Sequence, residues 1–437
     1  MVRSRMLAAV ILVAGVVAGS ISGPAGPSVD PNTPRTLPEY LQYAALHNAG
    51  LKAAFEEWKA ALEQIPQAKA LPDPRFTYGY FIKEVETRVG PQEQRFSLTQ
   101  VFPWFGTIAA RTDVAAAEAN VAQQRYENAK LRLFYQVKDA YYEYVYLRRA
   151  IEIAQENLEL IRHFEEVARE KYIAAVAQHP DIIRAQVEQA ILEDKLKELQ
   201  ELRKPVTARL RAVLNLPGDT ALPWPQAEPM HSIDVKRSEL FEILKRQNPQ
   251  LEAKEFELAA AESRIELAKR RFYPELGVGV DWIDTDEAMM AGVPDSGKDP
   301  VILMFSMNVP IWRKSYKAGE LQARAQARRV RHEKQDLENN LASQVERVLY
   351  GFEDSGRKAR LYGEVLVPKA GELVGASETA YTSGKIDFLS LINAQQTLLQ
   401  YQLQLERSQA SNQQRLAELE MLVGADATQI GSSRPVD

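Results

Sequence analysis

The chain of 437 residues contains no cysteine. Disulfide bonds, thiol catalysis, cysteine-ligated metals and lipidation of an N-terminal cysteine are therefore excluded. Histidine is also scarce, and the five histidines lack the spacing of a metal site. They are His47, His163, His179, His231 and His332. Because no catalytic constellation or phosphate-binding loop is recognisable either, the sequence predicts no enzyme activity, no cofactor and no bound metal.

An excess of charge of one sign is also missing. The chain has 54 basic and 59 acidic residues, for a formal net charge of −5, and its basic runs are short. Proteins that bind nucleic acid usually carry clustered positive charge. Nucleic acid is therefore not an expected partner.

Long apolar runs are missing too, with one exception near the N-terminus. Arg3 and Arg5 precede an apolar stretch of 14 residues at positions 6–19, which small residues follow. This order is typical of a secretory signal peptide, which we place at residues 1–22. A membrane anchor is the alternative, but it needs about 20 apolar residues. Residues 23–36 are rich in Pro, Gly and Ser and predict a flexible tether.

Proline and glycine are absent from Thr107 to about Tyr172, which predicts one uninterrupted helix. At about 1.5 Å per residue, this helix is a rod of roughly 100 Å. The preceding FSLTQVFPWFG, at residues 96–106, alternates like a strand until Pro103, which cannot continue the ladder. A similar strand and corner, FSMNVPIW at residues 305–312, precede a second long helical stretch.

The two halves of the chain repeat one unit. Identical residues recur first at an offset of 200 and later at an offset of 209: Asn48 and Asn248, Leu51 and Leu251, Pro74 and Pro274, then Ala185-Gln186 and Ala394-Gln395. The nine extra residues lie in a loop at 283–300, as a tandem duplication with one insertion predicts. We assign residues 37–216 to the first repeat, 217–234 to a Pro-rich linker, 235–424 to the second repeat and 425–437 to a C-terminal tail.

Each long helix is followed by a turn and a returning helix. The first return carries leucine or valine at every seventh position, the pattern of a coiled-coil seam: Leu192, Leu199, Val206 and Val213. Glycines and Pro368 within residues 351–375 predict a kink in the second long helix. The expected fold class is mainly α with a small β part, in which long antiparallel helical hairpins plus two strands are duplicated in tandem.

The strands have one apolar face and one small or polar face. We expect Val278, Val280, Leu303 and Phe305 on the first face, and Gly279, Ser306 and Asn308 on the second. Both a membrane barrel with a wet lumen and a half-buried soluble sheet give this pattern. Aromatic residues favour the barrel, because Trp and Tyr prefer the membrane interface and four of them lie towards the strand ends: Trp104, Tyr273, Trp282 and Trp312.

Four stretches carry a resemblance to the TolC-like outer-membrane efflux channels, within which the chain looks most similar to the heavy-metal and cation branch. They are ALPDPRFTYG at 70–79, VFPWFG at 101–106, DIIRAQVE at 181–188 and YTSGKIDFLSLINAQ at 381–395. The resemblance implies a homotrimer whose three chains form a 12-stranded β-barrel in outer-membrane lipid, continued by a periplasmic α-helical barrel. It also implies two protein partners, a periplasmic adaptor and an inner-membrane pump of the RND type. Ser20 stands where many relatives carry a lipidated cysteine.

The resemblance also implies functional positions around the two helical turns. Five residues correspond to a constriction of the periplasmic entrance, of which only two are acidic: Asp181, Arg184, Asp387, Ser390 and Asn393. Asp181 has an alternative role as a cap of the returning helix. Four turn residues correspond to adaptor-docking tips: Tyr172, Ala175, Tyr381 and Gly384. Because glycine accepts a positive φ more readily than alanine, we expect the two tips to differ as docking sites for the adaptor.

Two functions from different classes remain open at this level. The first is a passive trimeric conduit that exports small molecules or metal cations. The second is a soluble periplasmic coiled-coil scaffold whose strands form a small sheet.

Overall fold

The computed structural model describes residues 34–225, 231–234, 237–426 and 432–435. The expected signal peptide lies outside these ranges, as do most of the expected tether and parts of the linker and the tail. The first repeat contains α1 (Leu37–His47), α2 (Ala49–Leu62), α3 (Gln64–Lys69), β1 (Arg75–Thr87), β2 (Gly90–Phe102), α4 (Thr107–Ile173) and α5 (His179–Leu214). The rest contains β3 (His231–Asp234), α6 (Arg237–Gln247), α7 (Pro249–Arg270), β4 (Leu276–Thr285), β5 (Val301–Met307), α8 (Arg313–Arg360), the π-helix η1 (Leu361–Leu366), α9 (Val367–Thr382), α10 (Phe388–Val423) and β6 (Ser432–Pro435).

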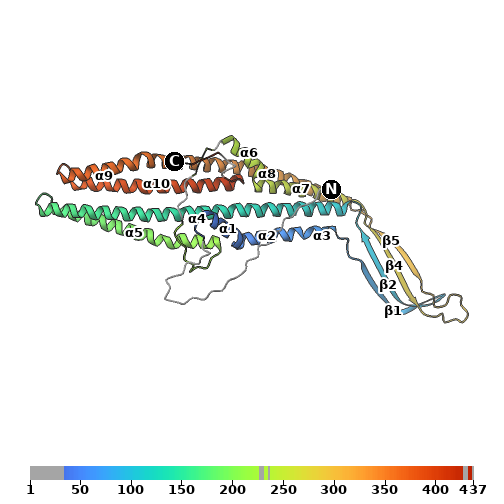
Figure 1. Cartoon of the computed structure of the whole chain (residues 1–437). Helices are drawn as coiled ribbons and strands as arrows, with labels where there is room; N and C mark the ends of the chain where they lie inside the picture. The colour runs from blue at the N-terminus through green and yellow to red at the C-terminus, as the bar shows by residue number, and fades with distance from the viewer. Residues whose placement is uncertain (1–33, 226–230, 235–236, 427–431, 436–437) are drawn as a thin grey trace, which may run out of the picture.

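The molecule is elongated, with a sheet at one end and two helical tips at the other (Figure 1). The hairpin of α4 and α5 runs beside the hairpin formed by α8, η1, α9 and α10. The shorter helices α2, α3 and α7 pack on the long helices near the sheet. The strands and the helical tips therefore lie at opposite ends of the long axis.

The structure repeats with the offsets seen in the sequence. The helices α5 and α10 begin and end at positions 209 residues apart, and α1 and α6 at positions 200 residues apart. Asn48 caps α2 by accepting from Leu51 N at 2.9 Å, while its Nδ2 donates to Val213 O at 2.8 Å. Asn248 does the same for α7, since its Nδ2 donates to Leu422 O at 2.7 Å. The duplication therefore extends to individual hydrogen bonds.

The expected rod is a single helix, α4, of 67 residues. It begins after Gly106, whose φ of 80° lets the chain turn sharply from the corner into the helix. Its counterpart is interrupted by η1, which ends just before Pro368 at the start of α9. Proline has no N–H and its ring crowds the preceding turn, so the local pairing widens. The predicted break in the second long helix is thus a π-helical segment.

Apolar side chains hold each hairpin together. The predicted heptad is confirmed, since Leu192 and Leu199 are buried and Val206 and Val213 pack at the edge of the α4–α5 core. A separate cluster joins α6, α7, α8 and α10. Near the tips, one apolar cluster joins α4 and α5 to α9 and α10. Buried polar groups also lie between the hairpins. There Gln395 Nε2 donates to Asn157 Oδ1 at 3.0 Å, and Asn157 Nδ2 donates to Gln402 Oε1 at 2.8 Å.

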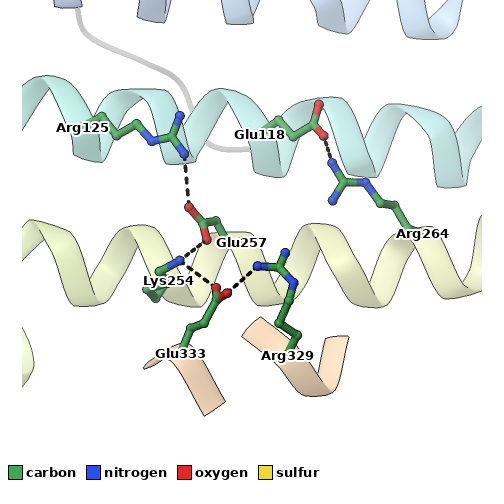
Figure 2. A network of polar contacts seen from close by, with 7 residues as sticks. All are labelled: Glu118, Arg125, Lys254, Glu257, Arg264, Arg329 and Glu333. Carbon is green, nitrogen blue, oxygen red and sulfur yellow. Dashed lines mark hydrogen bonds and ion pairs between the residues drawn. The ribbon is translucent and has the colours of Figure 1, made fainter. Parts of the chain in front are cut away.

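Charged side chains link α4 of the first repeat to α7 and α8 of the second (Figure 2). Arg125 of α4 pairs with Glu257 of α7 at 3.2 Å, and Lys254 joins Glu257 at 2.6 Å to Glu333 of α8 at 3.2 Å. Two further pairs, Glu118–Arg264 and Arg329–Glu333, extend the network. Because exposed ion pairs are individually weak, we interpret the network as setting the register of α7 between α4 and α8.

The four long strands form one antiparallel sheet in the order β1-β2-β4-β5. Directly paired residues share a face, so Val280 lies beside Leu303, and Val278 beside Phe305, as the alternation predicts. The register adds Phe76, Tyr78, Phe96, Leu98 and Trp282 to this side of the sheet, which we call the outer face. The opposite side, which includes Gly277, Gly279 and Asp281, is the inner face, and these residues are buried.

One expected strand residue lies elsewhere. Asn308 was assigned to the polar face, but β5 ends at Met307. The side chain of Asn308 instead accepts the backbone N–H of Glu275, the residue just before β4. Asn308 therefore terminates the β4–β5 pairing rather than lining the face.

Candidate functional site

The two helical tips have the same backbone turn. Ala175 N donates to Tyr172 O at 2.9 Å, and Gly384 N donates to Tyr381 O at 3.0 Å. Ala175 has a φ of 56° and Gly384 a φ of 76°, so both residues are left-handed. The backbone turn therefore does not distinguish the two tips, and their expected difference as docking sites stays a prediction. Alanine is held in a conformation that costs an L-residue about 1–2 kcal/mol.

The side chains at the two tips do differ in exposure. Tyr172 is 46% exposed at the first tip, whereas Tyr381 is only 4% exposed at the second. Ile173 and Val176 are also exposed, which makes the first tip an apolar surface. Of the four proposed docking residues, Tyr381 supports its turn from inside.

Tyr381 connects the two hairpins through its hydroxyl group. Its Oη donates to Oδ2 of Asp181, at the start of α5, over 3.4 Å. Arg184, one turn further along α5, lies 3.6 Å from the other oxygen of Asp181. The structure thus brings together three of the residues proposed from the sequence, one of them proposed for docking rather than constriction.

Lys171 of α4 adds a second connection that sequence reasoning missed. Its Nζ donates to the backbone oxygens of Tyr381 and Thr382, the latter at 2.9 Å. The same Nζ lies 4.6 Å from the centre of the Tyr381 ring, within reach of a cation–π interaction. The position of Lys171 one residue before Tyr172 gives no sign of this role, because the contact depends on how the hairpins lie side by side.

Asp387, rather than Asp181, caps a returning helix. Asp387 Oδ1 accepts from Ser390 N at 3.0 Å and from Ser390 Oγ at 2.6 Å, at the first turn of α10. The residue before α5 is Gln178, and Asp181 makes no cap hydrogen bond there. The capping role considered for Asp181 is therefore wrong. Ser390 is committed to this cap, and Asn393 is exposed on the next turn.

Two pKa shifts follow from this geometry. Burial, and then the negative charge of Asp181, raise the pKa of the Tyr381 hydroxyl to about 12. The hydroxyl therefore remains a hydrogen-bond donor at neutral pH. Hydrogen bonds from the Ser390 hydroxyl and backbone N–H hold the pKa of the Asp387 carboxyl below its usual range. Asp387 is therefore negatively charged wherever the tip is folded at neutral pH.

The four proposed interface aromatics lie in two regions of the sheet. Trp104 and Tyr273, one from each repeat, stack with ring centres 5.2 Å apart at the corner between sheet and helices. Trp312 lies at the corresponding corner before α8 and is 72% exposed. Trp282, towards the far end of β4, stacks on Phe96 and donates to Asp299 Oδ2 at 3.2 Å.

In the part of the chain that the structure describes, no group of three or more His, Asp or Glu side chains is arranged to hold a metal ion. No helix within the described residues has the length and apolarity needed to cross a membrane.

Comparison with known proteins gives consistent matches along the chain. The sequence model described as "Outer membrane efflux protein" matches residues 40–216 and 240–425. Nodulation protein T of Rhizobium leguminosarum bv. trifolii is 22% identical over 410 residues, covering 89% of this chain and 85% of that protein. The cobalt-zinc-cadmium resistance protein CzcC of Cupriavidus metallidurans is 23% identical over 379 residues, 84% of each chain. The crystal structure of the outer membrane protein VceC from Vibrio cholerae has a TM-score of 0.73 at 16% identity, covering 89% of this chain and 96% of that one.

The family match includes both repeats, and this chain belongs to the outer membrane efflux protein family. Members of this family are outer-membrane channels of tripartite efflux systems, in which the channel works with an adaptor and an inner-membrane pump. Such a channel lies in the outer membrane and extends into the periplasm. Of the two functions left open by the sequence, the conduit is the one the family supports.

Proposed function

We propose that three copies of this chain form one passive export channel, a 12-stranded β-barrel continued by an α-helical tube. The sheet is the observation that carries this proposal. It has four strands, which are too few to close, and no described strand pairs with the free edges of β1 and β5. Lipid does not tolerate unpaired strand edges. Edge pairing between copies removes them, and three copies supply a number of strands that closes well.

The helical part supports the same assembly. On α5, Ile183, Val187 and Ile191 form an exposed apolar stripe with helical spacing. On the other hairpin, Leu361, Val365 and Leu373 are exposed along η1 and α9. The helices α5 and α9 lie on opposite sides of the molecule (Figure 1). Each stripe could then pack against the hairpin of a neighbouring copy in a closed ring.

The outer face then contacts outer-membrane lipid. Its exposed side chains are large and apolar, with Phe76 at 64% and Phe305 at 75% exposure. Trp104, Tyr273 and Trp312 would lie at one membrane interface and Trp282 towards the other, as interfacial aromatics do. The inner face, with glycine and polar residues, lines a lumen filled with water.

The tips form the inner mouth of this channel and dock the adaptor. Exposed apolar side chains at the first tip, above all Tyr172 and Ile173, provide a surface for a protein partner. The link between Tyr381 and Asp181 holds the two hairpins together, and Asp387 adds negative charge at the same level. We propose that these residues hold the mouth closed until an adaptor and an RND-type pump dock. We assign no catalytic step to the chain, and its cargo is small molecules or metal cations, of which the name of CzcC gives an example.

Crosslinking across the free edges tests the trimer. The chain has no cysteine, so Tyr80→Cys on β1 and Leu303→Cys on β5 introduce unique thiols on the outer face at opposite edges. We expect flexible bis-maleimide reagents to give covalent dimers and trimers with the double variant in outer membranes. Either single variant alone should give neither product in quantity, because equivalent positions lie far apart around a closed barrel.

Fractionation and conductance complete the test. A channel is extracted only with detergent and produces discrete conductance steps in planar bilayers. Release as a soluble monomer by osmotic shock, with no crosslinked trimer, contradicts the proposal.

A further inference from the structure

An ion pair with one buried partner crosses the inner face of the sheet. Arg95 lies on β2 and Asp281 on β4, 186 positions apart and in different repeats. Arg95 Nε donates to Asp281 Oδ2 at 2.7 Å, and Nη2 of the same side chain donates to the same oxygen. The pair therefore connects the two repeats directly within the sheet.

Strand register explains why these two side chains meet. Arg95 is paired with Ile283, and Asp281 lies two residues earlier in β4, as the diagonal neighbour on the same face. On its other side, Arg95 is paired with Gly79 of β1, which has no side chain. Ser97 lies directly beside Asp281. Asp281 is thus the acid that the sheet places within reach of Arg95.

The two charges differ in exposure. The Asp281 side chain is 0% exposed, whereas the Arg95 side chain is 48% exposed. The acid is thus covered, while the arginine that contacts it remains open to solvent. A solute that passes the inner face therefore meets a positive group whose counter-charge is fixed directly behind it.

We propose that Arg95 and Asp281 determine the ion selectivity of the outer part of the channel. The three copies would form a ring of three Arg95–Asp281 ion pairs in the barrel lumen. This inference rests on the proposed trimer, in which the inner face lines the lumen. Six opposite charges at one level cancel at a distance, so the ring admits both anions and cations. A charged ring inside low-dielectric walls concentrates one sign of ion strongly. Removing either charge of the pair therefore makes a neutral exit selective for ions of one sign.

Single-channel recordings of four variants test this inference. Asp281→Asn keeps the shape of the side chain and leaves three unpaired guanidinium groups, so the chloride-to-potassium permeability ratio should rise at least about two-fold. Arg95→Gln leaves three carboxylates, and the ratio should fall below that of the wild type. Arg95→Gln combined with Asp281→Asn restores neutrality and should return the ratio to the wild-type value. Both single-variant shifts should shrink between 0.1 M and 1 M KCl, because the screening length falls from about 10 Å to about 3 Å.

Asp284→Asn is the matched control. It removes one carboxylate from the same strand, but Asp284 is paired with Gln94 on the outer face. Its permeability ratio should remain that of the wild type. If Arg95→Gln does not assemble, because Asp281 is left buried without its counter-charge, the neutral double variant and Asp281→Asn still decide the question.

The outcomes separate this inference from the proposed channel. A wild-type protein that conducts no ions overturns the channel itself. A wild-type protein that conducts, with Asp281→Asn leaving the permeability ratio unchanged at 0.1 M KCl, overturns only the role of the pair in selectivity. A lower thermal stability of trimers without any change in selectivity assigns the pair to holding β2 against β4, and likewise overturns it.

Discussion

The hydroxyl of Tyr381 donates to Asp181 over 3.4 Å, although the two residues are 200 positions apart and belong to different repeats. This hydrogen bond lies where the two hairpins end, furthest from the sheet (Figure 1). Any movement that separates the tips must break it.

Tyr381→Phe removes the hydroxyl and keeps the ring. We expect the closed mouth to lose about 0.5–1.5 kcal/mol per copy, the net value of one hydrogen bond. The open fraction of single channels in planar bilayers should then rise about two- to ten-fold for each link. Tyr172→Phe, at the corresponding position of the first tip, is the control and should change little. An unchanged open fraction in Tyr381→Phe contradicts the role of this hydrogen bond.

The same link should fail at alkaline pH. A tyrosine released by opening has an ordinary pKa near 10, whereas in the closed tip the pKa of Tyr381 is raised to about 12. Between these values the open form releases a proton that the closed form keeps, so the stability of the closed form falls as pH rises from about 10 to 12. Fluorescent labels on introduced cysteines at the two tips report their separation in detergent. Tyr381→Phe should lack this transition, and an identical transition in both proteins would falsify its assignment to Tyr381.

Charge and capping at the inner mouth should separate in Asp387 variants. Asp387→Asn removes the charge but retains a good N-cap, so cation preference should decrease while trimers remain stable. Asp387→Ala removes both functions and should also loosen α10. The cap depends on a carboxyl whose pKa is lowered, so it should be present at and above ordinary carboxyl pKa values and be lost only as pH falls below them.

Asp181→Asn gives a second comparison at the same level. Arg184 lies 3.6 Å from Asp181 and offsets part of its charge, so the mouth is less negative than six free carboxylates. We expect Asp181→Asn to reduce cation preference while α5 stays folded, because Asp181 does not cap it. Unchanged selectivity in both Asp181→Asn and Asp387→Asn argues against an electrostatic role for either residue.

The first turn should be stabilised by glycine. Ala175 has a φ of 56°, so Ala175→Gly relieves strain and should raise stability by up to about 1 kcal/mol after the entropic cost of glycine. Ala174→Gly is the control, because Ala174 has a φ of −74° and gains nothing from glycine. Thermal unfolding of the two variants in detergent measures the difference. Equal shifts would exclude relief of strain.

The two faces of the sheet should respond oppositely to arginine. Val280→Arg places a charge on the outer face and should impair assembly, since arginine in the lipid midplane costs about 2–4 kcal/mol. Gly279 is unsuitable as the comparison, because a Cβ there would lie 2.8 Å from Thr99 Oγ1 and 3.2 Å from Leu98 O. Ser306 is exposed on the inner face, and Ser306→Arg should assemble but conduct less. Similar trimer yields from both variants count against a lipid-facing outer surface.

Local pattern was sufficient to predict most of the fold. The absence of proline and glycine from Thr107 to about Tyr172 predicted the long helix, and Pro103 predicted where the strand before it ends. The heptad on α5 predicted which of its side chains pack against a neighbouring helix. The alternation on β4 and β5 predicted which side chains share a face of the sheet. These features depend on residues close in sequence, so spacing alone reveals them. The repeat offsets added the second half, although not the end of β5 at Met307.

The site depended on which distant side chains meet. Its place just after the turn made Asp181 a candidate helix cap, but the cap in the structure is Asp387 on α10. Glycine was expected to favour the left-handed turn at Gly384, and Ala175 adopts the same turn. Lys171 and the pair of Arg95 with Asp281 carried no local signal, because each contact joins the two repeats across about 200 residues. A sequence pattern determines which face of its own helix or strand a residue occupies. Only the packing of one hairpin on the other, and of β2 on β4, determines which partner that face meets.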